Sequence, residues 1–255
     1  MDNALTEKVA LLRDEANYAA DVITNDVALT GIREECVWNV LESYHVVINR
    51  IVDIMHDLLE GVGHYVLVFV LSNLIEVAKF FSIDTFNCRV ATFSYGCYDR
   101  NKPRPLKEDF SKRKKLSLSA SEMLTLIRVL GPLIEDYVPE GNPVWHLYLS
   151  FKSVVDFVVS SSIPLNGSDM LRTLVEELND AYLKLTKENL EAKFHFLTHY
   201  PELVELIGSL LPVWAMRNEA KDQVFKTSAD ATTSRLNVFH FSHEKSAEIL
   251  RKIAV

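Results

Sequence analysis

The sequence predicts a mainly α-helical protein with little β-structure. Long stretches place apolar residues at helical spacing, and the chain has only eight glycines among its 255 residues. Hydrophobic residues make up 48% of the chain and charged residues 24%, which is typical of a soluble globular protein with a core of good size. The net charge of −8 argues against binding of polyanions through bulk charge. This length permits one large domain or two small ones.

Residues 1–43 are expected to form an N-terminal segment of helix and loop. A helix is predicted from Thr6 to Ala20, and the polar stretch around Gly31 indicates a loop. The first ten residues contain no apolar signal segment, so secretion is not expected. The three cysteines are widely spaced. This disfavours a disulfide framework and a cysteine zinc site, and it fits a reducing compartment, nuclear or cytoplasmic.

Residues 44–80 are expected to form a core strand followed by a helix. The segment 44–52 is rich in β-branched residues and predicts a buried strand, although the pattern alone does not exclude a helix. From Ile54 the apolar residues follow the helical period to about Phe80. The longest apolar run, 65–75, is interrupted by polar residues and is too short to span a bilayer. It predicts a buried helix and no membrane contact.

Five titratable residues fall on one face of this expected helix. Their spacing of i, i+3, i+4, i+7 and i+11 puts them opposite the apolar stripe, and they are Asp53, His56, Asp57, Glu60 and His64. An acidic residue where a buried strand becomes a helix is well placed to hold a divalent metal. The alternative is an amphipathic helix with a solvated polar face and Asp53 as its N-cap. Spacing alone does not decide between the two.

Residues 81–192 are expected to form a series of helices. Ser119 and Glu122 have the spacing of a capping box. A second helix is predicted to begin at Asn142, and a long amphipathic helix is predicted from Asp169 to about Ala192. We expect this region to contain no internal repeat.

A basic segment interrupts these helices between Arg100 and Lys115. Eight cations stand there against two acidic residues, and two prolines separate them. The segment is expected to be exposed and mobile without a packed element. Such a cluster can contact nucleic acid, serve as a nuclear-import signal, or simply be a solvated loop. The residues expected to contact nucleic acid are Arg104, Lys112, Arg113, Lys114 and Lys115.

Residues 193–228 and 229–255 complete the chain. The aromatic stretch 194–198 predicts a short strand or an extended lead into a helix. Pro212 precedes a helix that carries Arg217 and Glu219. Arg217 is expected to pair with a phosphate or a surface carboxylate, and His199 to satisfy backbone groups. The tail is rich in Ser and Thr until a predicted helix from Ser242 to Ile253.

Three stretches of the chain resemble one family of mobile-element proteins. Residues 53–62 read D-I-M-H-D-L-L-E-G-V, which resembles the D-x-M-H-D-x-x-E-G-V signature of transposon-encoded proteins similar to the Kyakuja–Dileera–Zisupton group of cut-and-paste transposases. Residues 116–141 resemble the same family, as do His199-Tyr200-Pro201 followed by residues 214–221. The resemblance runs from about Gly31 to Lys226.

The resemblance implies a ribonuclease-H-like catalytic core that holds two magnesium ions for phosphodiester chemistry. Asp53 matches the acid after the fourth core strand, and Glu219 resembles the final acid. The family therefore implies that these two side chains lie close together, with residues 81–192 as a helical insertion. His56, Asp57 and Glu60 are further candidate metal ligands, since they share a helical face with Asp53.

Two departures from the family pattern imply a truncated, catalytically incomplete core. No run of strands with an acid precedes residue 44, and Asp222 stands where the family commonly has histidine. The chain is therefore expected to be a binding remnant of a transposase that contacts DNA or another chain supplying the missing core. One alternative is an active two-metal nuclease or transposase subunit that uses Asp53 and Glu219. Another is a helical phosphohydrolase built on the His56-Asp57 dyad, which would need further ligands from His45, His64, His195 or His199.

Overall fold

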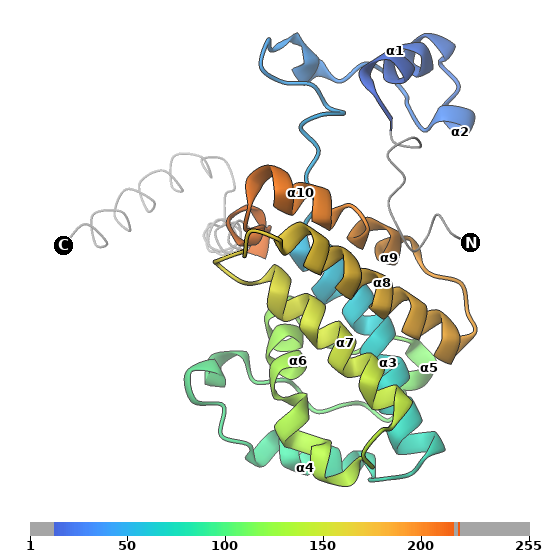
Figure 1. Ribbon diagram of the computed structural model, residues 1–255. Coiled ribbons are helices and arrows are strands. Elements are labelled where there is room, and N and C mark those ends of the chain that lie inside the picture. The colour runs from blue at the N-terminus through green and yellow to red at the C-terminus, as the bar shows by residue number, and fades with distance from the viewer. Residues whose placement is uncertain (1–12, 217–218, 220–255) are drawn as a thin grey trace, which may run out of the picture. The chain divides into compact units, whose positions relative to one another are not determined.

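The computed structural model describes residues 13–216 and residue 219. The chain divides into two units, residues 1–212 and 213–255. Every regular element within the described residues is helical, which confirms the mainly α prediction (Figure 1). The helices are α1 Glu15–Thr24, α2 Val27–Thr30, η3 Val37–Val40, η4 Met55–Val62, α3 Gly63–Ser72, η5 Asn73–Val77, α4 Ile83–Thr92, η6 Gly96–Asn101, α5 Phe110–Arg113, α6 Ala120–Ile134, η7 Glu135–Tyr137, α7 Pro143–Val158, α8 Gly167–Thr186, α9 Ala192–Leu197, α10 Tyr200–Ile207 and η8 Leu211–Val213.

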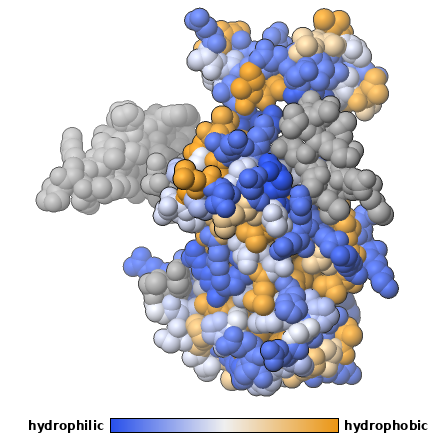
Figure 2. Space-filling view, in the orientation of Figure 1, coloured by the Kyte–Doolittle hydropathy of each residue, from blue (hydrophilic) through white to orange (hydrophobic). Residues whose placement is uncertain are grey.

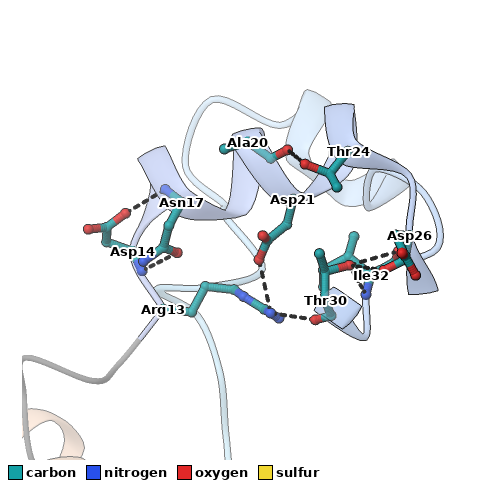
Figure 3. A network of polar contacts seen from close by, with 9 residues as sticks. All are labelled: Arg13, Asp14, Asn17, Ala20, Asp21, Thr24, Asp26, Thr30 and Ile32. Carbon is teal, nitrogen blue, oxygen red and sulfur yellow. Dashed lines mark hydrogen bonds and ion pairs between the residues drawn. The ribbon is translucent and has the colours of Figure 1, made fainter. Parts of the chain in front are cut away.

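The N-terminal segment is held together by short polar contacts. Asp14 and Asn17 form a capping box, so helix α1 begins at Glu15, inside the region where a helix was expected from Thr6. The Arg13 guanidinium contacts the Asp21 carboxylate at 3.0 Å and donates to the carbonyl oxygen of Thr30 at 2.6 Å, which joins α1 to the end of α2 (Figure 3). Polar contacts therefore fix the geometry of this segment.

Few apolar side chains are enclosed in this N-terminal segment. Within residues 13–53, Tyr18 is the one fully enclosed side chain. Several large apolar side chains are exposed instead, among them Ile23, Leu29, Trp38 and Val40. Figure 2 shows hydrophobic surface over the part of the chain that contains α1 and α2. Apart from Tyr18, the buried hydrophobic residues of the described chain begin at Ile54.

The expected strand at 44–52 is wrong, because this segment is irregular chain with a single turn at residues 46–48. The side-chain oxygen of Asn49 accepts from the backbone N–H of His45 at 2.7 Å, and that of Asn39 accepts from Val46 N–H at 3.0 Å. These local bonds use backbone groups that a strand ladder would need. Ile48 and Ile51 are each 56% exposed, so the β-branched residues do not form a buried face.

One continuous helix from Met55 to Val77 forms the centre of the core. It begins in the wide π form as η4, continues as α3, and ends in a second π stretch, η5. This confirms the helix predicted from Ile54, although it ends three residues before Phe80. A Cβ at Gly63 would lie only 2.8 Å from the carbonyl oxygen of Leu58, so glycine suits the tight backbone approach at the π-to-α junction.

The helix Met55–Val77 is apolar and long enough to cross a membrane by composition alone. However, 67% of its most apolar window is buried inside the protein. Helices α6, α7 and α9 pack against its η4 and α3 parts, α8 packs against α7 and α10, and Figure 1 shows α3 running between these elements. This is the burial expected of the central helix of a bundle.

The bundle accommodates Pro132 inside α6 through Tyr148 of α7. Proline cannot donate a helical hydrogen bond, so the preceding turn is a weak point of the helix. The buried Tyr148 hydroxyl donates to the carbonyl oxygen of Ile127 at 2.9 Å and accepts from Gly131 N–H at 3.1 Å. Burial raises the pKa of Tyr148, so the hydroxyl keeps the proton that it donates.

Candidate functional site

Asp53 lies immediately before η4 and bonds locally. One carboxylate oxygen accepts from the backbone N–H of Met55 at 3.1 Å, and the other pairs with Nδ1 of His56. The Asp53 carbonyl oxygen also accepts from Asp57 N–H at 2.9 Å. These contacts match the capping interpretation of Asp53, because they satisfy donors that the first helical turn leaves free.

Asp57 is buried and bonded to two side chains from the other end of the sequence. Its side chain is 8% exposed, and Oδ1 lies 2.9 Å from the Nζ atom of Lys193. Its Oδ2 atom lies 3.4 Å from the hydroxyl of Tyr200, which is fully buried. Lys193 belongs to α9 and Tyr200 begins α10, so Asp57 joins the central helix to the last helices of the first unit. We call Asp57, Lys193 and Tyr200 the Asp57 cluster.

The surroundings of Tyr200 in the Asp57 cluster determine where its proton lies. Burial raises the pKa of Tyr200 well above its ordinary value, and the negative charge and hydrogen bond of Asp57 raise it further. Tyr200 therefore keeps its proton and donates it to the carboxylate. Gly61 leaves room for the Lys193 side chain to pass, because a Cβ at position 61 would lie 3.0 Å from Cγ of Lys193. The carboxylate is thus paired with a cation and a hydroxyl group.

The expectation of one shared polar face is wrong for two of its five members. His56 and Glu60 are exposed and Asp53 is half-buried, whereas Asp57 and His64 are buried. The expectation assumed 3.6 residues per turn, but η4 is a π-helix in which hydrogen bonds run from i to i+5. This wider turn changes the direction in which each side chain leaves the helix.

His64 uses one ring nitrogen to bond the backbone. Its Nδ1 atom accepts from Leu116 N–H at 3.2 Å. Burial, together with the smaller effect of the positive charge of Lys115, lowers the pKa of His64 to about 4. The imidazole is therefore neutral at pH 7, and it connects the central helix to the segment before α6.

His199 and its neighbours also differ from expectation. Residues 194–198, predicted as a strand or extended lead, lie in α9 and the turn that follows it. The His199 carbonyl oxygen accepts from Leu203 N–H at 3.3 Å, and its ring meets that of His195 edge-on at 4.9 Å between centroids. The backbone of His199 thus helps to begin α10, whereas the expected role of its side chain in satisfying backbone groups stays a prediction.

The candidate final acid belongs to the second unit. Glu219 is exposed and helical, and its N–H donates to the carbonyl oxygen of Ala215 at 2.9 Å. Arg217 lies outside the described residues. The expected approach of Asp53 and Glu219 stays a prediction, because the two residues belong to different units.

The described carboxylates of the first unit do not fit a two-magnesium site by themselves. Asp57 is neutralised by Lys193 and Tyr200, and Asp53 is engaged by His56 and the Met55 N–H. Among residues 13–216 and 219, no group of three His, Cys, Asp or Glu side chains is arranged as a metal site. A hard cation needs several oxygen ligands that face one point, so such a site would need ligands from elsewhere.

The basic segment is better packed than expected. Leu106, Phe110 and Leu116 are buried, and Phe110 begins the short helix α5. The expectation that no packed element forms there is therefore wrong, because three apolar side chains anchor the segment between the prolines and α6. The five cations expected to contact nucleic acid are nevertheless exposed.

Among the residues that the structure describes, three of these five cations have acidic partners. Arg104 binds Glu122 through two hydrogen bonds of 2.8 and 2.7 Å, while Glu122 also forms the predicted capping box with Ser119. Arg113 pairs with Asp109, and Lys114 lies 3.5 Å from Glu188.

No family model, curated protein or solved structure matches this chain.

Proposed function

We propose that this chain is a transposase-derived binding domain that has lost autonomous catalysis and contacts DNA through its basic segment. The observation that carries the proposal is the Asp57 cluster. The second carboxylate of the D-x-M-H-D stretch is bound by Lys193 and Tyr200, so it stabilises the bundle where a metal ligand would need an open coordination position. Nuclear localisation and a partner chain that supplies further parts of a core belong to the same proposal.

The form of the basic segment supports contact with the phosphate backbone. Phe110 and Leu116 anchor it, while residues 112–115 place four exposed cations in succession. The pairs made by Arg113 and Lys114 are solvent-exposed, and exposed ion pairs contribute little to stability. A DNA phosphate can therefore replace their acidic partners at small cost. Because the net charge of the whole chain is negative, we expect DNA to contact this basic segment and not the rest of the surface.

Replacing residues 112–115 with alanine is expected to weaken DNA binding and to reduce its salt dependence. Each lost phosphate contact should lower the slope of log affinity against log salt by about 0.9 for duplex DNA, because fewer counterions are released. Fluorescence anisotropy with labelled duplex DNA between low and moderate salt measures both quantities. The matched control replaces four cations of α7, α8 and the turn that follows: Lys152, Arg172, Lys184 and Lys187. Equal effects of both variants would contradict a contact at the basic segment.

The alternative is an active two-metal nuclease or transposase subunit that uses Mg²⁺. One observation favours it: Asp53 lies at the start of the core helix with part of its carboxylate solvent-accessible, and Glu219 is exposed. The alternative requires the two acids to meet across the units, and His56 or Glu60 to complete the ligands.

We expect the isolated chain not to nick or join DNA above background with Mg²⁺ or Mn²⁺. Magnesium demands near-octahedral geometry and gives up water reluctantly, so two carboxylates alone would hold it loosely. Linear and hairpin DNA labelled at one end would report cleavage by gel electrophoresis. Metal-dependent nicking that disappears in both Asp53→Ala and Glu219→Gln would identify the chain as an enzyme.

A further inference from the structure

A pocket of about 180 Å³ opens between α3, α5 and the end of α8. Three aromatic rings form part of its wall and three charged side chains stand around it: Tyr65, Phe69, Tyr182, Lys114, Glu188 and Glu191. All of these residues belong to the first unit. The volume is smaller than the roughly 300–1,000 Å³ of pockets that enclose drug-sized ligands, so the pocket suits a group the size of one side chain.

The end of α8 determines which side chains reach the pocket. Tyr182 is buried in the last turn but one, and its ring centroid lies 6.4 Å from that of Phe69 across the helix interface. Lys187 then takes a left-handed conformation with φ of 56° and ends the helix. The chain reverses there, and Glu188 N–H donates to the Thr186 hydroxyl at 3.2 Å. After this turn, Glu188 and Glu191 line the pocket together with the aromatic residues.

The electrostatics of the pocket favour a positive charge. Burial first, and then the negative charges of Glu188 and Glu191, raise the pKa of Tyr182 to about 12. The carboxylates therefore act on the buried wall of the pocket. Aromatic faces carry negative quadrupole potential and attract ammonium and guanidinium groups. The aromatic rings and the carboxylates thus both favour binding of a cation.

The chain already places a cation of its own at this pocket. Nζ of Lys114 lies 3.5 Å from Oε1 of Glu188, with the two side chains 73% and 60% exposed. An exposed pair at this separation contributes little to stability, so another ammonium group can displace Lys114 at small cost. Lys114 also lines the pocket, which makes it a competitor for the same carboxylate.

We propose that this pocket binds a compact alkylammonium cation, presented either by a lysine or methylated lysine side chain of a partner peptide or by a free quaternary ammonium ion. Both sources share a positive charge carried on apolar alkyl groups, which matches the aromatic wall and the acidic rim. The proposal does not rest on DNA binding by the basic segment, although Lys114 belongs to both surfaces.

The test compares peptides that differ only in the charge of one side chain. A fluorescein-labelled heptapeptide with a central trimethyl-lysine is expected to bind about tenfold tighter than the same peptide with acetyl-lysine, because only the former carries a cation. Fluorescence anisotropy with the full chain measures both affinities. Equal affinities would overturn the proposal. Tetramethylammonium chloride serves as the competitor. If its inhibition constant equals the dissociation constant of the labelled peptide, the result points to a free cation as the ligand. If its inhibition constant is higher, the result points to a peptide.

Three substitutions locate the binding in this pocket. Glu188→Gln should weaken binding of the trimethyl-lysine peptide about fivefold, and Phe69→Leu should weaken it as well, since cation–π and charge contributions are each of this size. Lys114→Met should tighten binding, because it removes the internal competitor. Glu177→Gln, an exposed acid of α8 that does not line the pocket, is the matched control. Unchanged binding by Glu188→Gln, or weaker binding by Lys114→Met, would overturn the assignment.

Discussion

Replacing Lys193 with methionine is expected to lower the free energy of unfolding by about 3 kcal/mol at pH 7, because it leaves the Asp57 carboxylate without its cation. Asp57 is 8% exposed at its side chain and Lys193 36%. The partial exposure of Lys193 and the remaining hydrogen bond from Tyr200 keep the cost at the lower end of the range for breaking buried pairs. Urea unfolding followed by circular dichroism gives the value.

A double-mutant cycle separates the lost pair from the general effect of substitution. Asp57→Asn combined with Lys193→Met removes both charges and should be more stable than Lys193→Met alone, since no unpaired charge remains buried. The same samples test the metal alternative. A metal that binds only the folded chain would raise wild-type stability with its concentration, so stabilisation of the wild type by Mg²⁺ that Asp57→Asn abolishes would contradict the structural role of Asp57. Strict additivity of the two substitutions would contradict the pair itself.

Local signals in the sequence predicted much of the helical fold. Ser119 and Glu122 form the predicted capping box, and the central helix begins next to the predicted residue, Ile54. Both features depend on residues within one or two turns. The strand prediction for the β-branched segment 44–52 failed because a high strand propensity does not form a strand without a neighbouring strand to pair with. In addition, the side chains of Asn39 and Asn49 accept hydrogen bonds from the backbone of this segment.

The candidate site was harder to predict because its contacts are distant in sequence. Asp57 and Lys193 are separated by 136 positions, and no periodic pattern connects them. The π form of η4 also turned Asp57 and His64 inward, away from the face that a 3.6-residue period assigns to them. One signal was present: Gly61, one turn after Asp57, leaves space beside the helix for another side chain, and Lys193 fills it.

Acid is expected to destabilise the folded chain through His64 between about pH 6.5 and pH 4. The pKa of His64 is lowered to about 4 in the folded chain by burial first and then by Lys115, whereas an unfolded histidine titrates near 6.5. Within this interval the unfolded state binds the proton and the folded state does not, so stability falls as the pH falls. The contribution present above pH 6.5 and lost near pH 4 is about 3 kcal/mol, since one pKa unit corresponds to about 1.4 kcal/mol.

His64→Asn isolates this contribution. The asparagine side-chain oxygen can replace Nδ1 as the acceptor for Leu116 N–H, but the amide does not titrate. Carboxylates such as Asp136, whose pKa the hydrogen bond from Arg89 lowers, also destabilise the fold in acid, and they do so equally in both proteins. The difference in unfolding free energy between wild type and His64→Asn should therefore change by about 3 kcal/mol from pH 7 to pH 4 in urea titrations. A difference that stays constant over this interval would mean that His64 accepts a proton in the folded chain as readily as in the unfolded one.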